Sequence, residues 1–131
     1  MITIRNQFIP LKGSKAMTIW PFLFLRMNTV MTDDDMNHEH IHGRQQREAA
    51  IASAVIIATL CLMCHISWWW MLLSLGVYYA WYGIEYGIRR IICGDQDKAY
   101  RGIAFEAEAY ANEDNMDYLK HRRPFAFIKY M

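Results

Sequence analysis

The feature that most constrains this fold is a block of forty residues, 49 to 88, that contains no lysine or arginine. Its only formally charged residue is Glu85. A membrane crossing needs about 20 apolar residues, so a block of this length is typical of a membrane-embedded helical hairpin. The alternative is a soluble helical core, but one buried helix of a small domain does not need so long a stretch without a cation. At 131 residues the chain fits one domain, so any active site shares its scaffold with this block.

The middle of the block predicts a tight turn. Residues 64–67 (Cys-His-Ile-Ser) are its least apolar stretch, and Trp68, Trp69 and Trp70 follow as an interfacial aromatic cluster. All 14 Lys and Arg residues lie outside the block. By the positive-inside rule, we expect both termini, and any site they build, in the cytoplasm. Membrane lipid is therefore an expected partner, whereas the net charge of +1 gives no reason to expect nucleic acid.

The segment before the block predicts a small β element followed by a helix. Residues 2–9 and 16–25 are apolar and partly alternating, which predicts two short strands joined by a turn at residues 10–14. Pro21 would confine the second strand to a sheet edge. Thr32 followed by three aspartates is a helix N-cap signature, with carboxylates at the positive end of the helix dipole.

The segment after the block predicts a second helix. Gly94-Asp95-Gln96-Asp97 breaks the chain, and residues 100–119 favour a helix that Pro124 stops. Glu85 and Arg89 are four residues apart, a spacing that favours an ion pair on one helix face. The tail, residues 125–130, is interpreted either as a final strand or as a membrane-surface anchor.

Residues 38–42 (His-Glu-His-Ile-His) match the pattern H-E-x-x-H. On a helix, residues four apart lie on one face, so His38 and His42 can share a metal ion. Glu39 projects from a neighbouring position, where a carboxylate can accept a proton from water acidified by Zn²⁺. His40 lies off the shared face, so we expect it at the surface or behind the ligands.

A catalytic zinc site also needs a third protein ligand and one open position. The candidates lie in residues 105–110 (Phe-Glu-Ala-Glu-Ala-Tyr). Glu106 and Glu108 are two residues apart and point in different directions on a helix, so one of them reaches the metal and the spacing does not say which. Tyr110, one turn after Glu106, is placed to donate a hydrogen bond to a developing oxyanion or simply to pack.

The pairing of this H-E-x-x-H segment with Glu106-Ala107-Glu108-Ala109-Tyr110 resembles the gluzincin metallopeptidases, in particular the membrane-associated prenyl-protein-peptidase and beta-lactam-sensor types. In those families a second helix supplies a glutamate ligand from an ExxAD-type motif. The resemblance implies that Glu106 is the ligand and Glu108 is not. The chain departs from the motif at Tyr110, where those families have Asp. Residues 37–47 and 99–118 also resemble a small uncharacterised bacterial family of single-domain proteins.

The expected architecture is a mainly α-helical single domain with a short N-terminal β-hairpin. Its expected segments are the β-hairpin at residues 1–30, the H-E-x-x-H helix at 33–48, the membrane-type helical hairpin at 49–90, the glutamate-bearing helix at 97–123 and a tail at 124–131. The expected function is that of a membrane-associated zinc metallopeptidase that hydrolyses a peptide bond. In it, His38, His42 and Glu106 hold Zn²⁺, Glu39 is the general base, and Tyr110 assists.

Two alternatives come from other classes of protein. The first is a non-catalytic zinc-binding membrane protein with an interaction or regulatory role. The second is a membrane c-type haem protein, because Cys61-Leu62-Met63-Cys64-His65 matches C-x-x-C-H. Both cysteines lie in a continuous apolar run, where cysteine behaves as a small hydrophobic residue, so the haem reading is the weaker of the two.

Overall fold

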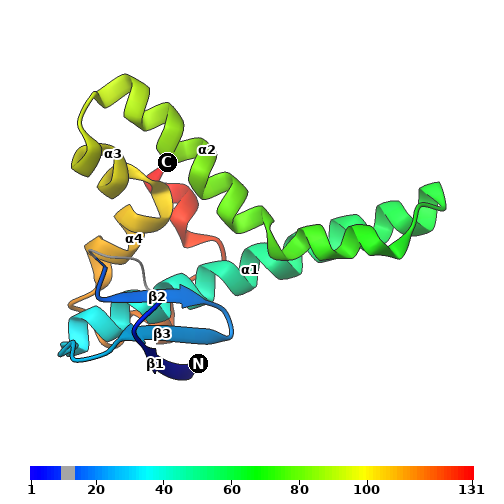
Figure 1. The fold of residues 1–131 in the computed structure, drawn as a ribbon. Coiled ribbons are helices and arrows are strands. Elements are labelled where there is room, and N and C mark those ends of the chain that lie inside the picture. Colours follow the sequence, from blue (N-terminus) through cyan, green and yellow to red (C-terminus); the bar gives the residue numbers. More distant parts are fainter. Residues whose placement is uncertain (10–13) are drawn as a thin grey trace.

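The computed structural model describes residues 1–9 and 14–131 and confirms a mainly α-helical chain with a small sheet near its N-terminus (Figure 1). The strands are β1 (Ile2–Asn6), β2 (Ala16–Ile19) and β3 (Phe22–Arg26). The α-helices are α1 (Asp33–Cys64), α2 (Val77–Cys93), α3 (Gln96–Gly102), α4 (Ala104–Asn112) and α5 (Tyr118–His121), and the 3₁₀ helices are η1 (Trp68–Leu75) and η2 (Ala126–Tyr130).

The sheet contains three strands in the order β1-β3-β2, where the sequence predicted two. β2 and β3 form the antiparallel hairpin, and β1 pairs in parallel with β3. The stretch 16–25 is divided at Pro21, which lies in the turn between β2 and β3 and not in an edge strand. Its carbonyl accepts a hydrogen bond from the Ile2 amide (2.9 Å), which ties β1 to this turn. The turn expected at residues 10–14 falls largely outside the described residues.

The predicted N-cap of α1 is confirmed. The Thr32 hydroxyl accepts from the Asp35 amide (3.1 Å), and the Asp35 carboxylate accepts from the Thr32 amide (3.0 Å), which is a reciprocal capping box. The helix then runs for 32 residues, a length of about 48 Å. After Glu48 its only buried residue is Cys61, so the second half projects from the rest of the molecule (Figure 1).

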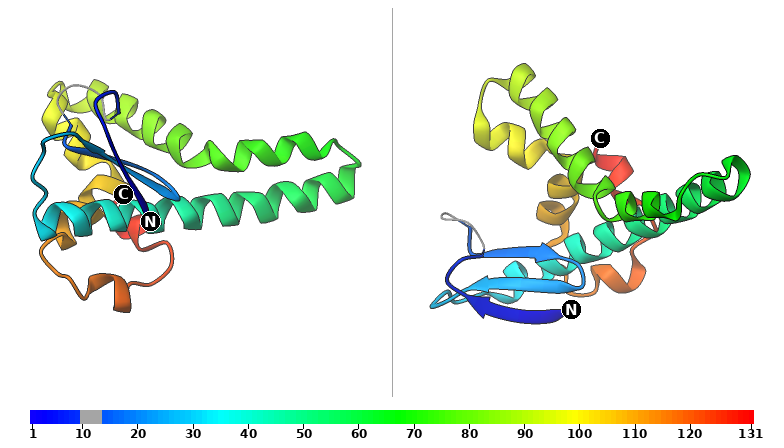
Figure 2. Two further views of the ribbon diagram at one scale, coloured as in Figure 1. Left: turned by 60° about the horizontal axis from the view of Figure 1, so that its bottom comes forward. Right: turned by 45° about the vertical axis from the view of Figure 1, so that its right-hand side comes forward.

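The turn of the apolar block also lies where it was expected. α1 ends at Cys64, and His65 adopts a left-handed conformation (φ 51°) that reverses the chain. η1 returns beside α1, as the views in Figure 2 show. Ser53 on α1 donates to the carbonyl of Ser74 (3.3 Å), which joins the two arms. α1 is long and apolar enough to cross a membrane.

The expected second arm does not continue antiparallel to α1 as far as residue 90. α2 turns away from the projecting arms and passes over the middle of α1 and α4 (Figure 1). Its Glu85 pairs with Arg89 (2.9 Å), as the spacing predicted. The same carboxylate accepts from the Ala104 amide (2.9 Å) at the beginning of α4, where a negative charge is favourable.

The long helix expected over residues 97–123 is divided into three. α3 ends at Gly102, and Ile103 is extended (ψ 133°) and fully buried before α4 begins. The tail is not a strand. It forms η2, in which Phe127 is buried with its ring centroid 4.6 Å from that of Phe105 and 5.9 Å from that of Trp81.

A buried ion-pair network fastens the C-terminal segment to α1 and α4. Arg122 donates to Glu48 (2.7 Å) and, through two of its nitrogens, to Glu108. Tyr118 also donates to Glu108 (2.9 Å). Arg122 is 1% exposed and Glu108 is fully buried, so each charge depends on the other for compensation.

Replacing Arg122 by alanine is expected to lower the free energy of unfolding by about 3–5 kcal/mol, because the buried Glu108 would lose its counter-charge and Glu48 would keep only Arg44. Chemical unfolding of the detergent-solubilised protein measures this change. Arg123→Ala, which removes an exposed neighbour of the same charge, is the matched control. Equal stability of the two variants would contradict this role for the network.

Candidate metal centre

His38 and His42 lie one turn apart on the buried face of α1, close to its capped N-terminus. The sheet holds this part of the helix in place through Gln46, whose side chain donates to the Thr18 carbonyl (2.8 Å) and accepts from the Trp20 amide (2.7 Å). β2 therefore lies directly against the turn of α1 that bears the H-E-x-x-H motif.

Glu106 reaches the two imidazoles from α4. Its carboxylate oxygens lie 3.4 Å from His38 Nε2 and 3.3 Å from His42 Nε2, and the two Nε2 atoms are 3.0 Å apart. The three residues have ligand atoms within 4.8 Å of one another and could hold a metal ion. Ligand atoms 2.0–2.1 Å from a tetrahedral zinc ion are about 3.3–3.4 Å apart, so these separations suit one face of such a tetrahedron.

The outer nitrogen of each imidazole has an acceptor that fixes its tautomer. His38 Nδ1 lies 2.8 Å from the Glu113 carboxylate, and His42 Nδ1 lies 2.9 Å from Gln45 Oε1. The Gln45 amide nitrogen donates to the Phe105 carbonyl and to Glu108 (both 3.0 Å), so its oxygen must face His42. Both Nδ1 atoms thus carry hydrogen, and both Nε2 lone pairs face the Glu106 carboxylate.

Three acceptors therefore converge on one buried point. Glu106 is 3% exposed; its Oε1 accepts a hydrogen bond from the Tyr82 hydroxyl (2.9 Å), but its Oε2 has no hydrogen-bond partner among the described residues. Such an arrangement requires a cation, either a proton or a metal ion. Two imidazoles and one carboxylate with an open side are the donor set of catalytic zinc sites.

The charges of the site shift the pKa values of its members. Burial alone would lower the pKa of His42, but the charge and the hydrogen bond of Glu106 raise it to about 9. Burial alone would raise the pKa of Glu106, yet the neighbouring imidazoles His42 and His38 hold it well below its usual range. Without a metal, the site therefore retains a proton at neutral pH.

The affinity for zinc is expected to rise with pH by about tenfold per unit between pH 7 and 9, then to level off. Over that range zinc must displace one proton from His42, whose pKa is raised to about 9, so the two cations compete. The sign follows because more acidic solutions favour the protonated, metal-free site. Titration against a chelator of known pH dependence measures the effect, and a flat profile from pH 7 to 9 would contradict it.

The carboxylate of Glu39 lies beside this centre without joining it. It accepts a hydrogen bond from the Thr18 hydroxyl on β2 (2.6 Å). Two adjoining hollows of about 350 and 390 Å³ share His38, Glu39 and Tyr100 in their walls, and the first of them also contains His42 and Glu106. Glu39 therefore faces the space into which the open side of the metal centre points, where a base can take a proton from water.

The two candidate glutamates have different roles. Glu108, left open by the motif spacing, is bound by Arg122 and Tyr118 on the far side of α4, whereas Glu106 meets the histidines. Tyr110 does not point its hydroxyl at any described partner: its ring lies edge-on to His38 (4.7 Å between centroids) and under the Arg101 guanidinium (4.5 Å). Tyr110 thus packs against the His38 ring, which is the second of the two roles considered for it, packing instead of hydrogen bonding to an oxyanion.

Three polar contacts of the centre were missed by sequence reasoning: Gln45, Tyr82 and Glu113. Gln45 lies one turn after His42, a spacing that could have indicated it. Glu113 supplies to His38 a carboxylate that the ExxAD-type motif would have placed at Tyr110, and it does so from just beyond the end of α4. Tyr82 comes from α2, so its approach depends on tertiary structure alone.

Glu113→Ala is expected to weaken zinc binding by about 10- to 100-fold, because His38 would lose the acceptor that fixes its ring and tautomer. Competition with a zinc chelator at constant pH measures the loss. Asp117→Ala is the matched control, since Asp117 is an exposed carboxylate that pairs with Lys120 (2.5 Å). Equal affinities of the two variants would show that Glu113 does not orient the ligand.

The remaining motif residues lie outside this centre. His40 is exposed and is not one of the three converging residues, as its position on the helix indicated. In the C-x-x-C-H segment, Cys64 and His65 are exposed, but Cys61 is buried with its thiol directed at the Ser67 carbonyl (3.6 Å). Haem attachment through both cysteines would require this buried thiol to become accessible.

Comparisons with protein-family models, with curated proteins and with solved structures find no match to this chain.

Proposed function

We propose that this protein is a membrane-associated, zinc-dependent peptidase of the gluzincin kind. The observation that carries the proposal is the convergence of two imidazole lone pairs and an unpartnered carboxylate oxygen at one buried point beside Glu39. A zinc ion held there would polarise a substrate carbonyl and acidify a bound water molecule. His38, His42 and Glu106 are the proposed ligands, and the chain supplies the remaining groups of the reaction.

Glu39 is the proposed general base. Its carboxylate accepts a hydrogen bond from Thr18 and lines the hollow, where it can accept the proton of the attacking water and pass it to the leaving amine. Tyr100 lines both hollows, so its phenol lies in the wall of the space beside the proposed ligands. A hydroxyl there can stabilise negative charge on a tetrahedral intermediate.

The sheet supports a peptide as the substrate. β2 is an edge strand among the described residues, and Ala16 and Thr18 line the hollow that contains the proposed ligands. The Thr18 carbonyl and the Trp20 amide already bond to Gln46, so an extended peptide would pair with this edge beside Ala16, which places its backbone across the site. Four tyrosines, Ala16 and Met17 form the less polar part of the wall of this hollow, so an apolar side chain of the peptide would fit against them.

Membrane association follows from the projecting arms, and cytoplasmic placement of the site follows from the distribution of Lys and Arg. The test of the proposed function is cleavage of a peptide library by the zinc-loaded protein in detergent or lipid. Glu39→Gln should keep the zinc and stop the cleavage. Bound zinc without cleavage that depends on Glu39 would instead favour the non-catalytic alternative.

A further inference from the structure

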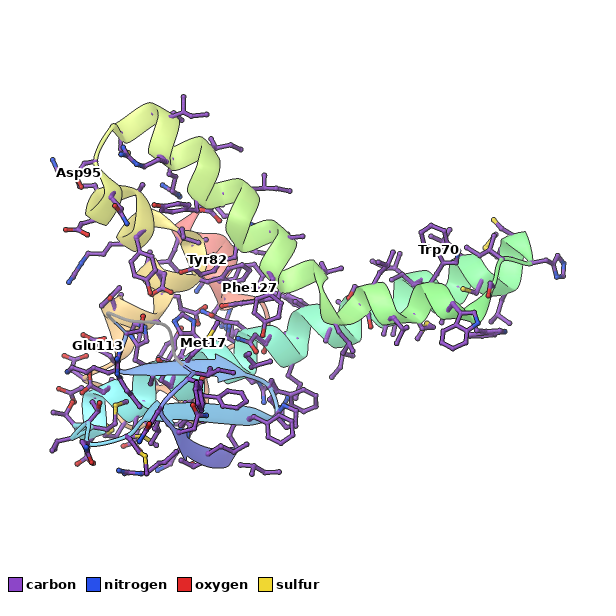
Figure 3. The ribbon with its side chains drawn as sticks, in the orientation of Figure 1. Met17, Trp70, Tyr82, Asp95, Glu113 and Phe127 are labelled. Atoms are coloured by element: carbon purple, nitrogen blue, oxygen red, sulfur yellow. The ribbon has the colours of Figure 1, made fainter. Side chains whose placement is uncertain are left out.

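α2 has two faces of opposite character. On one side the hydroxyls of Tyr78 and Tyr82 meet the metal centre, at 3.4 Å from His42 Nδ1 and 2.9 Å from Glu106. On the other side Ile84, Ile88 and Ile92, each four residues from the next, are 65%, 53% and 76% exposed. In Figure 3 Tyr82 lies between α2 and the helices of the site. The isoleucines form one stripe along the opposite side of the helix.

The isoleucine stripe borders an apolar groove of about 650 Å³. Val77 and Trp81 continue the groove toward the beginning of α2, and Met131 at the chain end closes one side. Among residues 1–9 and 14–131, its only charged lining residues are Glu85 and Arg89, which neutralise each other in an ion pair (2.9 Å). A continuous apolar surface of this extent is typical of a site that contacts lipid or protein.

Insertion of the projecting arms does not by itself cover this stripe. The arms are joined at Ser53 and Ser74, and from Ser53 to Cys64 α1 rises about 17 Å. Two residues after η1, Tyr78 and Tyr79 already contact Gln45 and Gln46 beside the metal centre (3.5 and 3.2 Å). α2 therefore begins at the level of the site, outside the paired arms, and turns away from them (Figure 1).

We propose that α2 lies along the surface of the membrane that receives the projecting arms, with Ile84, Ile88 and Ile92 among the acyl chains. The metal centre on its opposite face then sits at the bilayer surface. Lipid is the occupant that fits because the groove begins directly beyond the exposed Leu72, Leu73 and Leu75 of η1, so the apolar surface is continuous from one element to the next.

The charges at the end of α2 fit the same placement. Arg90 is an exposed cation in the last turn of the helix, between Ile88 and Ile92 in the sequence, where a cationic side chain can reach anionic headgroups. An amphipathic helix with a broad apolar face and a basic residue at its edge is typical of a segment lying in the membrane interface. The inference rests on the membrane association proposed above, but it does not depend on zinc binding or on peptide cleavage.

Nitroxide labels in vesicles of phosphatidylcholine and phosphatidylglycerol test this placement. The full chain with Cys61→Ala, Cys64→Ser and Cys93→Ser would carry a single label at Ile88→Cys, Trp69→Cys or Lys98→Cys. Trp69, like the neighbouring Trp70 labelled in Figure 3, lies on the projecting arm, and Lys98 is an exposed cation of α3. Retention of the secondary structure content of the unlabelled chain would show that each variant is folded.

The labels at residues 88 and 69 are both expected to collide several-fold more often with oxygen, which enters the acyl region, than with a water-soluble nickel complex. The label at 98 should show the reverse. A water-exposed label at 88 beside a lipid-exposed label at 69 would overturn the placement of α2 while leaving the membrane association intact. If the label at residue 88 is shielded from both reagents, and its spectrum is broadened by the label of a neighbouring molecule, the groove would be assigned to a second copy of the chain instead. Water exposure at both positions would overturn the membrane association itself.

Discussion

Replacing His38 by alanine is expected to reduce the zinc content of the purified protein from about one ion per chain to less than about a tenth. His38 supplies one of three proposed ligands, and its Nε2 lies 3.0 Å from that of His42 and 3.4 Å from Glu106. Removing it leaves two donors, which hold zinc far less tightly than a complete three-residue site. Elemental analysis after dialysis against a weak chelator measures the content.

The matched control for this change is His40→Ala, which removes the third imidazole of the same motif. His40 is not one of the residues that converge on the buried point, so its variant should keep the metal. Equal loss from both variants would mean that the histidines bind metal only unspecifically. Elemental analysis also identifies the ion, since Fe²⁺ shares the two-histidine, one-carboxylate donor set with Zn²⁺.

Glu39→Gln is expected to lower the rate of peptide cleavage by about 10²- to 10⁴-fold, the usual contribution of a general base, while the zinc content stays unchanged. The amide of glutamine can still accept the Thr18 hydrogen bond, so the wall of the hollow should be retained. It cannot take a proton from water. Single-turnover cleavage of a fluorogenic peptide by wild type and variant, each loaded with zinc, gives the ratio of rates.

Thr18→Val provides a graded comparison for the same step. It removes the hydroxyl that holds Glu39 without altering the carboxylate itself, and the expected loss is therefore smaller than in Glu39→Gln. Equal cleavage rates in wild type and Glu39→Gln would remove the peptidase claim. Because zinc content is measured separately, that result would leave the metal centre standing as a non-catalytic site.

The parts of the centre that could be predicted are those defined by spacing within one helix. The spacing of four between His38 and His42 brings the imidazoles onto one face, and Thr32 with three aspartates begins the helix that carries them. The turn at residues 64–67 could be predicted because these residues are the least apolar stretch of the apolar block. Each of these features depends on neighbours within a few residues, and the structure contains them where they were expected.

The features that could not be predicted depend on tertiary contacts. The burial of Ile103 divides the expected helix, and β1 pairs in parallel with β3 and is tied to the β2–β3 turn by the hydrogen bond from the Ile2 amide to the Pro21 carbonyl. Choosing Glu106 over Glu108 as the proposed ligand requires knowing where Arg122 lies, because Arg122 forms a buried ion pair with Glu108 on the other side of α4. Motif spacing alone contains no information on that partner.

The most direct test of the central claim is the zinc K-edge X-ray absorption spectrum of the zinc-loaded protein. We expect one ion with nitrogen and oxygen donors at about 2.0–2.1 Å, two of them imidazoles, and no sulfur at about 2.3 Å. The imidazole contribution should fall in His38→Ala and stay unchanged in His40→Ala. Sulfur ligation through the free cysteines, or a wild-type spectrum unaltered by His38→Ala, would contradict a centre built from His38, His42 and Glu106.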